Sequence, residues 1–279
     1  MKNKLVRIVA ALAAIACLGT AAYFAGLIWS TEREYQKGDD SYDTLAKLVK
    51  EDSGESPDPS GSDGSNNEDG DAAGSATNEN TDEESTQDIN LDLAKQLNSD
   101  ITAWLYCPDT VIDYPVCHGD DNSYYLTHLA DGNYNRNGCL FVDCKNSSDF
   151  SDDNTVIYGH HMASGKMFAS LIKYKDQDYY EEHSIMYLTT EEGTYMLELF
   201  SGYVTEIGSS AYIMNFGTAK ERTEWLKEIS NKSDFTANAM TISSKDRIIT
   251  LSTCAYDFQN ARYVVHGKIC KKSTNYRSD

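Results

Sequence analysis

Three side chains that could act together on a carbonyl group stand at the ends of apolar, strand-like runs. Cys254 follows one such run, His160 follows another across Gly159, and Arg262 opens a third. A side chain at the end of a buried strand is held rigidly and still faces a cleft. A thiolate is a nucleophile, an imidazole transfers protons near neutral pH, and a guanidinium stabilises an oxyanion. The pattern therefore predicts covalent catalysis with Cys254 as the nucleophile.

The choice of histidine stays open on these grounds. The sequence contains six histidines, and the adjacent pair His160 and His161 follows the buried run that ends at Tyr158. Neighbouring side chains on an extended chain point to opposite sides. We therefore expect one of the two, and not both, to share a site with Cys254.

The elements that must position these residues are mostly short strands. Apolar, β-favouring runs bounded by turn residues predict strands at 101–106, 111–116, 140–142, 155–158, 184–188, 194–205, 247–253 and 262–269. Helices are expected at 90–98, 165–174 and 218–230. The last of these opens with a capping box of Thr218 and Glu221. Many short strands with few helices predict a mostly β fold, a barrel or sandwich with helical decoration.

An uncharged run of 22 residues, Ile8 to Trp29, follows three basic residues near the N-terminus. About 20 such residues cross a bilayer as a helix, and basic residues before the run keep the N-terminus in the cytoplasm. We therefore expect a single-pass anchor in the cell membrane, with the catalytic domain outside the cell. A cleaved signal peptide is the alternative, although its apolar core is usually shorter, about 7–15 residues.

Acidic residues are concentrated in one segment. Residues 51–88 hold 13 acidic and no basic side chains, whereas residues 89–279 hold 17 basic against 26 acidic ones, a net of −9. This lack of a basic footprint excludes nucleic acid as a main partner. Segment 51–88 has almost nothing apolar, which predicts a disordered tether. We expect an anchor at 1–30, a stalk and linker at 31–88 and a catalytic domain at 89–279, with residues 30–88 dispensable for turnover on a soluble peptide.

Seven cysteines leave the redox state open. In an exported protein, Cys107–Cys117 and Cys139–Cys144 are conceivable disulfides, and buried free thiols fit the spacing equally well. The close CxxC pairs typical of zinc sites are absent from the sequence. We therefore expect no metal and no cofactor.

The three segments also resemble the signatures of a known family. Residues Thr250–Cys254, TLSTC, match the TLxTC signature of sortases, and Val156–Met162, VIYGHHM, resembles the segment that bears their catalytic histidine. Arg262 falls where their essential arginine is expected. The segments at 103–105, 112–116 and 121–126, and the helix at 218–230, are similar to class B sortases. The resemblance covers residues 90 to 270 in order and spacing.

This resemblance implies a closed, antiparallel or mixed β-barrel and cysteine transpeptidation outside a Gram-positive-type membrane. Cys254 would attack the Thr carbonyl in the C-terminal sorting motif of a surface protein and form a thioester. An amine, from a peptidoglycan precursor or a pilin lysine, would resolve that thioester. His160 would act as general acid and then as general base, and Arg262 would hold the substrate and the oxyanion.

The motif position selects His160, directly after Gly159, over His161. The same carry-over predicts five residues of the substrate groove: Asn122, Leu126, Tyr212, Ile213 and Ser252. The motif does not explain the long acidic tether. A spacer that reaches the cell wall or a growing fibre is the use we expect for it.

Two other functions compete with this hypothesis. A papain-like cysteine peptidase of the cell envelope also needs a cysteine and a histidine, but its cysteine normally precedes its histidine and lies at a helix N-terminus. A non-catalytic adhesion module on a stalk would make the three side chains coincidental. Loss of activity on alkylation of one thiol separates an enzyme from the adhesion module, and dependence on an amine acceptor separates a transpeptidase from a peptidase.

Overall fold

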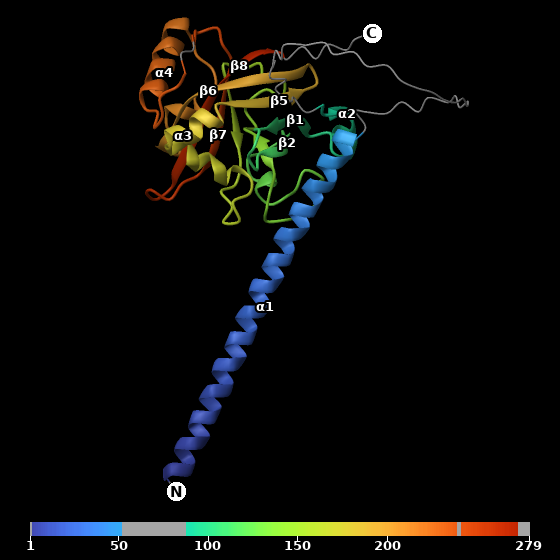
Figure 1. Cartoon of the computed structure of the whole chain (residues 1–279), viewed down its shortest axis with the longest axis vertical. Helices are drawn as coiled ribbons and strands as arrows, with labels where there is room; N and C mark the ends of the chain where they lie inside the picture. Colours follow the sequence, from blue (N-terminus) through green and yellow to red (C-terminus); the bar gives the residue numbers. More distant parts are fainter. Residues whose placement is uncertain (1, 52–87, 239–240, 273–279) are drawn as a thin grey trace, which may run out of the picture.

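Eight strands close into one barrel at the C-terminal end of a long helix, α1 (Lys2–Glu51) (Figure 1). The structure, a computed structural model, describes residues 2–51, 88–238 and 241–272. The strands are β1 (Ile101–Tyr106), β2 (Asp113–Cys117), β3 (Leu140–Val142), β4 (Asn154–Tyr158), β5 (Ile185–Thr190), β6 (Gly193–Glu206), β7 (Ile248–Cys254) and β8 (Ala261–Lys272). Around the barrel they follow the order β1-β2-β3-β4-β7-β8-β6-β5, with β2–β3 and β4–β7 parallel and the other pairs antiparallel. The predicted mixed barrel is confirmed.

The helices after α1 are short. They are α2 (Leu91–Leu97), α3 (Gln177–Glu182), α4 (Ala219–Asn231) and the 3₁₀ turns η1 (Tyr124–Leu126), η2 (Phe168–Lys175) and η3 (Ser210–Tyr212). The helix expected at 165–174 is thus a 3₁₀ helix that starts at Phe168, and α3 was not expected. The strand expected at 111–116 starts two residues later, because the hydroxyl of Thr110 donates to the Cys107 carbonyl and closes a turn.

Helix α4 begins as the sequence predicts and covers one side of the barrel. The Thr218 hydroxyl accepts a hydrogen bond from the Glu221 amide, and the Glu221 carboxylate accepts one from the Thr218 amide. Trp225, Leu226 and Ile229 pack on apolar residues of β6, β7 and β8. Both faces of β7 are therefore buried, one by the barrel interior and one by this helix.

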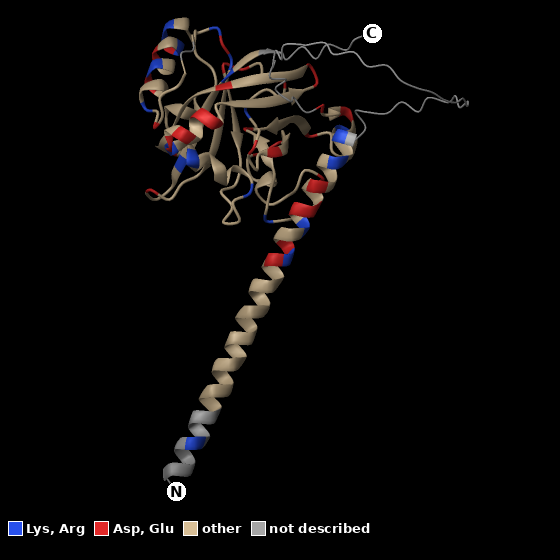
Figure 2. Ribbon diagram, viewed as in Figure 1, with Lys and Arg blue, Asp and Glu red and all other residues tan. Residues whose placement is uncertain are grey.

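Helix α1 has two halves of different character. Residues Leu12 to Trp29 are exposed, and an 18-residue window of the helix has a mean hydropathy of 1.8, enough to cross a membrane by length and composition. Figure 2 shows no charged residue along this stretch, and charges reappear where the helix reaches the barrel. There Tyr42, Leu45 and Val49 are buried in the main hydrophobic core, while Leu48 on the other face is exposed.

Polar contacts fix this second half of α1 on the barrel. The side-chain amide of Asn135 donates to the Glu34 carbonyl at 2.8 Å, and that of Asn137 donates to the Tyr35 carbonyl at 3.0 Å. Such contacts need close approach, and a Cβ atom at Gly38 would lie 2.3 Å from the Asn137 amide nitrogen. Residues 34–50 therefore belong to the folded body that contains the barrel.

The acidic segment begins only after α1 has reached the barrel. The Asn90 amide donates to the Val49 carbonyl at 2.9 Å, so the two sides of segment 52–87 meet. A spacer between membrane and barrel does not fit these contacts, because α1 already touches the barrel from Glu34 onward. The expectation that all of 30–88 is dispensable is accordingly narrowed to 52–87. The predicted disorder of that segment lies outside the described residues.

All seven cysteines are free thiols, so neither conceivable disulfide is formed. Cys107 instead lies 3.8 Å from the Tyr174 hydroxyl, and the sulfurs of Cys117 and Cys139 are 3.6 Å apart in the core. Burial raises the pKa of Cys107 and of Cys117. Within the described residues, no three His, Cys, Asp or Glu side chains gather as a metal would require.

Candidate active site

The strand register brings the three predicted catalytic residues to one end of the barrel. Strand β4 runs parallel to β7 with Tyr158 opposite Ser252, so the residues that follow β4 lie beside the end of β7. Strands β7 and β8 are antiparallel, with Cys254 directly opposite Arg262. Residues separated by a hundred positions in the sequence are therefore neighbours because the barrel pairs these three strands.

Gly159 lets the chain turn from β4 into the site. Its amide donates to the Ser252 carbonyl at 3.1 Å, and its carbonyl accepts from the Thr253 hydroxyl at 2.8 Å. A Cβ atom at this position would lie 2.5 Å from a Leu140 methyl group and 2.6 Å from the Phe168 ring. Close packing requires glycine at position 159, and that packing fixes the position of the next residue, His160, relative to Cys254.

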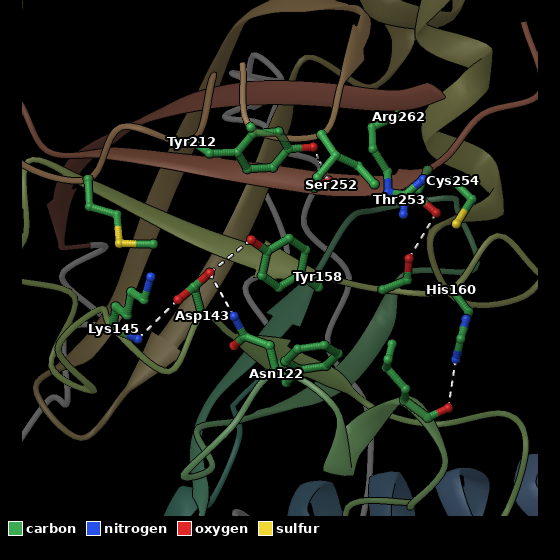
Figure 3. Close-up of a pocket in the computed structure, with 16 residues that line it drawn as sticks. Asn122, Asp143, Lys145, Tyr158, His160, Tyr212, Ser252, Thr253, Cys254 and Arg262 are labelled. Atoms are coloured by element: carbon green, nitrogen blue, oxygen red, sulfur yellow. Dashed lines mark hydrogen bonds between the residues drawn. The ribbon is translucent and has the colours of Figure 1, made fainter. Parts of the chain in front are cut away.

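The two neighbouring histidines have different partners. His160 donates from Nε2 to the Leu126 carbonyl at 2.7 Å, and it lines the groove next to Cys254 (Figure 3). His161 donates from Nδ1 to the backbone carbonyl of Cys254 at 2.9 Å and packs edge-on against Tyr256. As expected for adjacent residues, the two rings point to different sides. The His160 ring faces the groove, and the His161 ring lies outside it, hydrogen-bonded to the end of β7.

Arg262 completes this end of the groove. Its guanidinium donates to the Ala261 carbonyl at 3.0 Å, and the side chain is half-buried beside Cys254. Figure 3 shows it on the same wall as Ser252 and Thr253, across from His160. A fixed guanidinium next to a thiol can bind a carbonyl oxygen as negative charge develops on it.

A groove of about 600 Å³ starts at these three side chains. It is lined by Asn122, Leu126, Phe141, Asp143, Lys145, Tyr158, Gly159, His160, Ile207, Gly208, Tyr212, Met214, Ser252, Thr253, Cys254 and Arg262. Four of the five predicted groove residues are among them. The fifth, Ile213, lines a separate depression beside Trp225 of α4, and its carbonyl accepts from the Asn154 side chain.

The comparisons with known proteins agree with this geometry. The sortase domain family matches residues 105–270. The chain belongs to the sortase family. It is 38% identical over 180 residues to sortase B of Listeria monocytogenes and 34% identical over 181 residues to sortase B of Staphylococcus aureus. These alignments cover 64% of this chain in both cases and 73% and 74% of the two relatives.

Solved sortase B structures share the fold. The structure of Clostridium perfringens sortase B aligns with a TM-score of 0.62 at 34% identity, covering 65% of this chain and all of the other. A Staphylococcus aureus sortase B–substrate complex aligns with a TM-score of 0.62 at 33% identity, covering 65% and 85% of the two chains. The class B resemblance of the sequence is thereby confirmed, and the enzyme is a cysteine transpeptidase by family.

The far end of the sortase groove is organised by a carboxylate that the sequence analysis missed. Asp143 is buried and accepts hydrogen bonds from the Asn122 side chain at 3.0 Å and the Tyr158 hydroxyl at 2.9 Å. Its second oxygen accepts from the Lys145 amide at 3.0 Å. Burial and the adjacent Asp143 raise the pKa of Tyr158. A polar residue directly after the short apolar run 140–142 was the signal that could have pointed to it.

Tyr212 closes the opposite wall of the groove. Its hydroxyl lies 2.9 Å from the Ser252 hydroxyl, and its ring stacks with that of Tyr158 at 6.3 Å between centroids. Burial raises the pKa of Tyr212 as well. Both tyrosines therefore stay neutral and offer polar tips with flat apolar faces, a surface that suits an extended peptide.

Proposed function

We propose that this sortase cuts a C-terminal sorting motif after its Thr and transfers the protein to an amine. The supporting observation is that Cys254, His160 and Arg262 converge at one end of a groove of about 600 Å³. Asn122, Leu126, Tyr212 and Ser252 would bind the motif along that groove. We further propose that α1 anchors the enzyme as a single span, with its N-terminus in the cytoplasm and the barrel outside.

In the acylation step, the thiol proton of Cys254 passes to His160, and the thiolate attacks the carbonyl carbon of the Thr to form a tetrahedral oxyanion. Arg262 stabilises that oxyanion, and the C–N bond breaks as His160 gives a proton to the departing amine. The product is a thioester on Cys254. His160 holds Nε2–H toward the Leu126 carbonyl, which leaves its Nδ1 as the atom that exchanges the proton.

In the second step, an amine attacks the thioester carbon while His160 takes its proton. The C–S bond breaks and Cys254 is restored. A peptidoglycan precursor and a lysine of another surface protein both supply such an amine. Without it, water resolves the thioester and the net reaction is hydrolysis.

Mass spectrometry of the intact protein tests the proposal. Incubated with candidate sorting peptides, the wild type should gain the mass of the acyl fragment, and Cys254→Ala should gain none. Cys144→Ala is the matched control, since this partly exposed thiol stands between the groove residues Asp143 and Lys145 in the chain without lining the groove itself, and the variant should still form the adduct. An adduct that survives in Cys254→Ala would contradict the assignment. An enzyme that hydrolyses the peptide but never joins it to any added amine would instead fit the peptidase hypothesis.

A further inference from the structure

We propose that the end of the barrel carrying Cys254 rests on the membrane, with the aromatic β7–β8 turn in the lipid headgroup layer. The partner is the phospholipid bilayer that α1 crosses, so this inference rests on the proposed membrane anchor. It adds an orientation and a contact surface that the anchor alone does not require, because a flexible stalk would leave the barrel free to face any direction.

The height of the barrel above the bilayer is set by how soon α1 touches it. The apolar run ends at Trp29, and the carbonyl of Glu34 already accepts a hydrogen bond from Asn135 at 2.8 Å. Five residues of α-helix rise about 8 Å. The polar layer on each side of a bilayer is about 5–8 Å thick. The loop that holds Asn135 therefore lies at the outer edge of the headgroups.

The orientation of the barrel is fixed as well as its height. Contacts with α1 extend from Glu34 to Lys50, whose ammonium group lies 2.5 Å from the Asp113 carboxylate. Sixteen residues of helix span about 24 Å, too long a contact to act as a hinge. Figure 1 shows the turn between β7 and β8 and the loop after β4 on the lower side of the barrel, the side nearer the N-terminal half of α1, whereas α4 lies on the upper side.

The side chains at this end suit a lipid interface. Tyr256 and Phe258 on the β7–β8 turn are 79% and 50% exposed, and the charge of Asp257 between them is paired with Lys175 at 2.7 Å. On the loop that touches α1, Tyr134 is 64% exposed. Single exposed aromatics are ordinary on a protein surface. Here they lie at the end of the barrel that faces Trp29, and aromatic residues concentrate at membrane–water interfaces.

The consequence concerns access to the active site. His161 connects the turn to the nucleophile, because its ring contacts Tyr256 and its Nδ1 donates to the Cys254 carbonyl. With Tyr256 and Phe258 in the headgroups, Cys254 opens just above the lipid surface. The enzyme would then meet acyl donors and amines that are held on the same membrane at that height.

Lipid quenching of tryptophan fluorescence tests this contact. Full-length Phe258→Trp would be reconstituted in phosphatidylcholine–phosphatidylglycerol vesicles whose acyl chains are brominated near the headgroup. Emission of the added Trp, as the difference from wild type, should fall by at least a third. The matched control is Leu97→Trp on α2, which is also 50% exposed but lies at the Val49 end of α1. Its emission should be unchanged.

Tyr256→Trp repeats the measurement on an independent variant in case Phe258→Trp folds poorly. Equal quenching at 258 and 97 would overturn the proposal, as would a blue shift without bromine quenching, which indicates contact with a second protein copy. The readout needs no turnover, so an inactive enzyme that is still quenched would contradict only the proposed function. Failure of the chain to float with vesicles would overturn the anchor and the orientation together.

Discussion

The hydroxyl of Tyr42 on α1 donates a hydrogen bond of 2.5 Å to the carbonyl of Gly138, a residue that lies beside His160. A Cβ atom at Gly138 would lie 3.0 Å from the ring of His160 and 2.9 Å from the Leu126 carbonyl that this ring binds. The helix that carries the apolar run therefore contacts the loop that positions His160. Docking of α1 and geometry of the active site are linked through one residue.

The docking predicts a difference between two leucines three residues apart on α1. Leu45 is 5% exposed in the main core and Leu48 is 49% exposed. Leu45→Ala should lower the free energy of unfolding by about 2–4 kcal/mol, because it removes buried methyl groups and leaves a cavity. Leu48→Ala should change it by less than about 0.5 kcal/mol. Urea unfolding of both variants in the same detergent gives the comparison, and equal effects would show that α1 does not dock.

Gly138 should be intolerant of a side chain for a reason specific to the site. Its φ is +60°, and an added Cβ would also lie 2.6 Å from the Tyr125 carbonyl. Gly138→Ala should lower kcat/KM at least about tenfold, since small displacements of a proton-transfer group are costly. Gly165→Ala is the control: φ there is +83° and no atom lies within 4 Å of the added Cβ.

Both substitutions carry the left-handed backbone penalty of about 1–2 kcal/mol, and only Gly138→Ala adds the clash. Activity measured on folded protein at low temperature should therefore separate them. A Gly138→Ala enzyme as active as Gly165→Ala would mean that the loop can shift without moving His160.

Removal of the acidic segment 52–87 should leave the enzyme folded and active, whereas removal of the second half of α1 as well should not. Because Val49 and Asn90 are joined by a hydrogen bond, residues 52–87 can be replaced by a short Gly/Ser loop. Turnover of a soluble peptide should persist, and stability should rise by about 1 kcal/mol since a shorter loop costs less closure entropy. Deleting 31–87 should instead expose the core that Tyr42, Leu45 and Val49 cover. If the two deletions behave alike in thermal unfolding, the packing of α1 contributes nothing to stability.

The strand ends were predictable from the sequence because local patterns determine them. Cys254 and Arg262 are joined by one short loop, and Gly159 marks where β4 ends. The docking of α1 was not predictable in this way. Only three apolar side chains of an otherwise polar stretch are buried, and Glu34 and Tyr35 find their partners about a hundred residues away.

The residues that line the groove could be predicted from the sequence only where the resemblance to the sortase family covers them. Asp143, just after β3, links Asn122 in a loop to Tyr158 at the end of β4 through hydrogen bonds that span 21 and 15 residues of the sequence. No spacing rule connects such residues. Ile213 shows the opposite error, since its neighbour Tyr212 faces the groove while its own side chain turns to α4.

A buried histidine on β8 that does not line the groove, His266, should make the fold acid-sensitive. His266 is fully buried, with its two ring nitrogens 2.9 Å from the Thr250 hydroxyl and 3.3 Å from the Tyr203 hydroxyl. Burial, with a smaller effect of Lys232, lowers the pKa of His266 to about 3. The pKa of a histidine in the unfolded chain is near 6.5. Between pH 6.5 and pH 3 the unfolded chain therefore binds a proton at His266 that the folded protein does not bind.

The contribution of His266 to the free energy of unfolding is therefore fully present above about pH 6.5. It is lost as the pH falls toward 3, at up to about 1.4 kcal/mol per pH unit. Denaturant unfolding between pH 6 and 4.5 should show the wild type losing about 2 kcal/mol more than His266→Gln, whose side chain keeps hydrogen-bonding groups without titrating. The slope with pH is the readout, because any packing defect in His266→Gln lowers stability equally at both values. Parallel pH curves for the two proteins would mean that water reaches the charged ring in the folded state, with Lys232 moved away from it, so that charging His266 costs little.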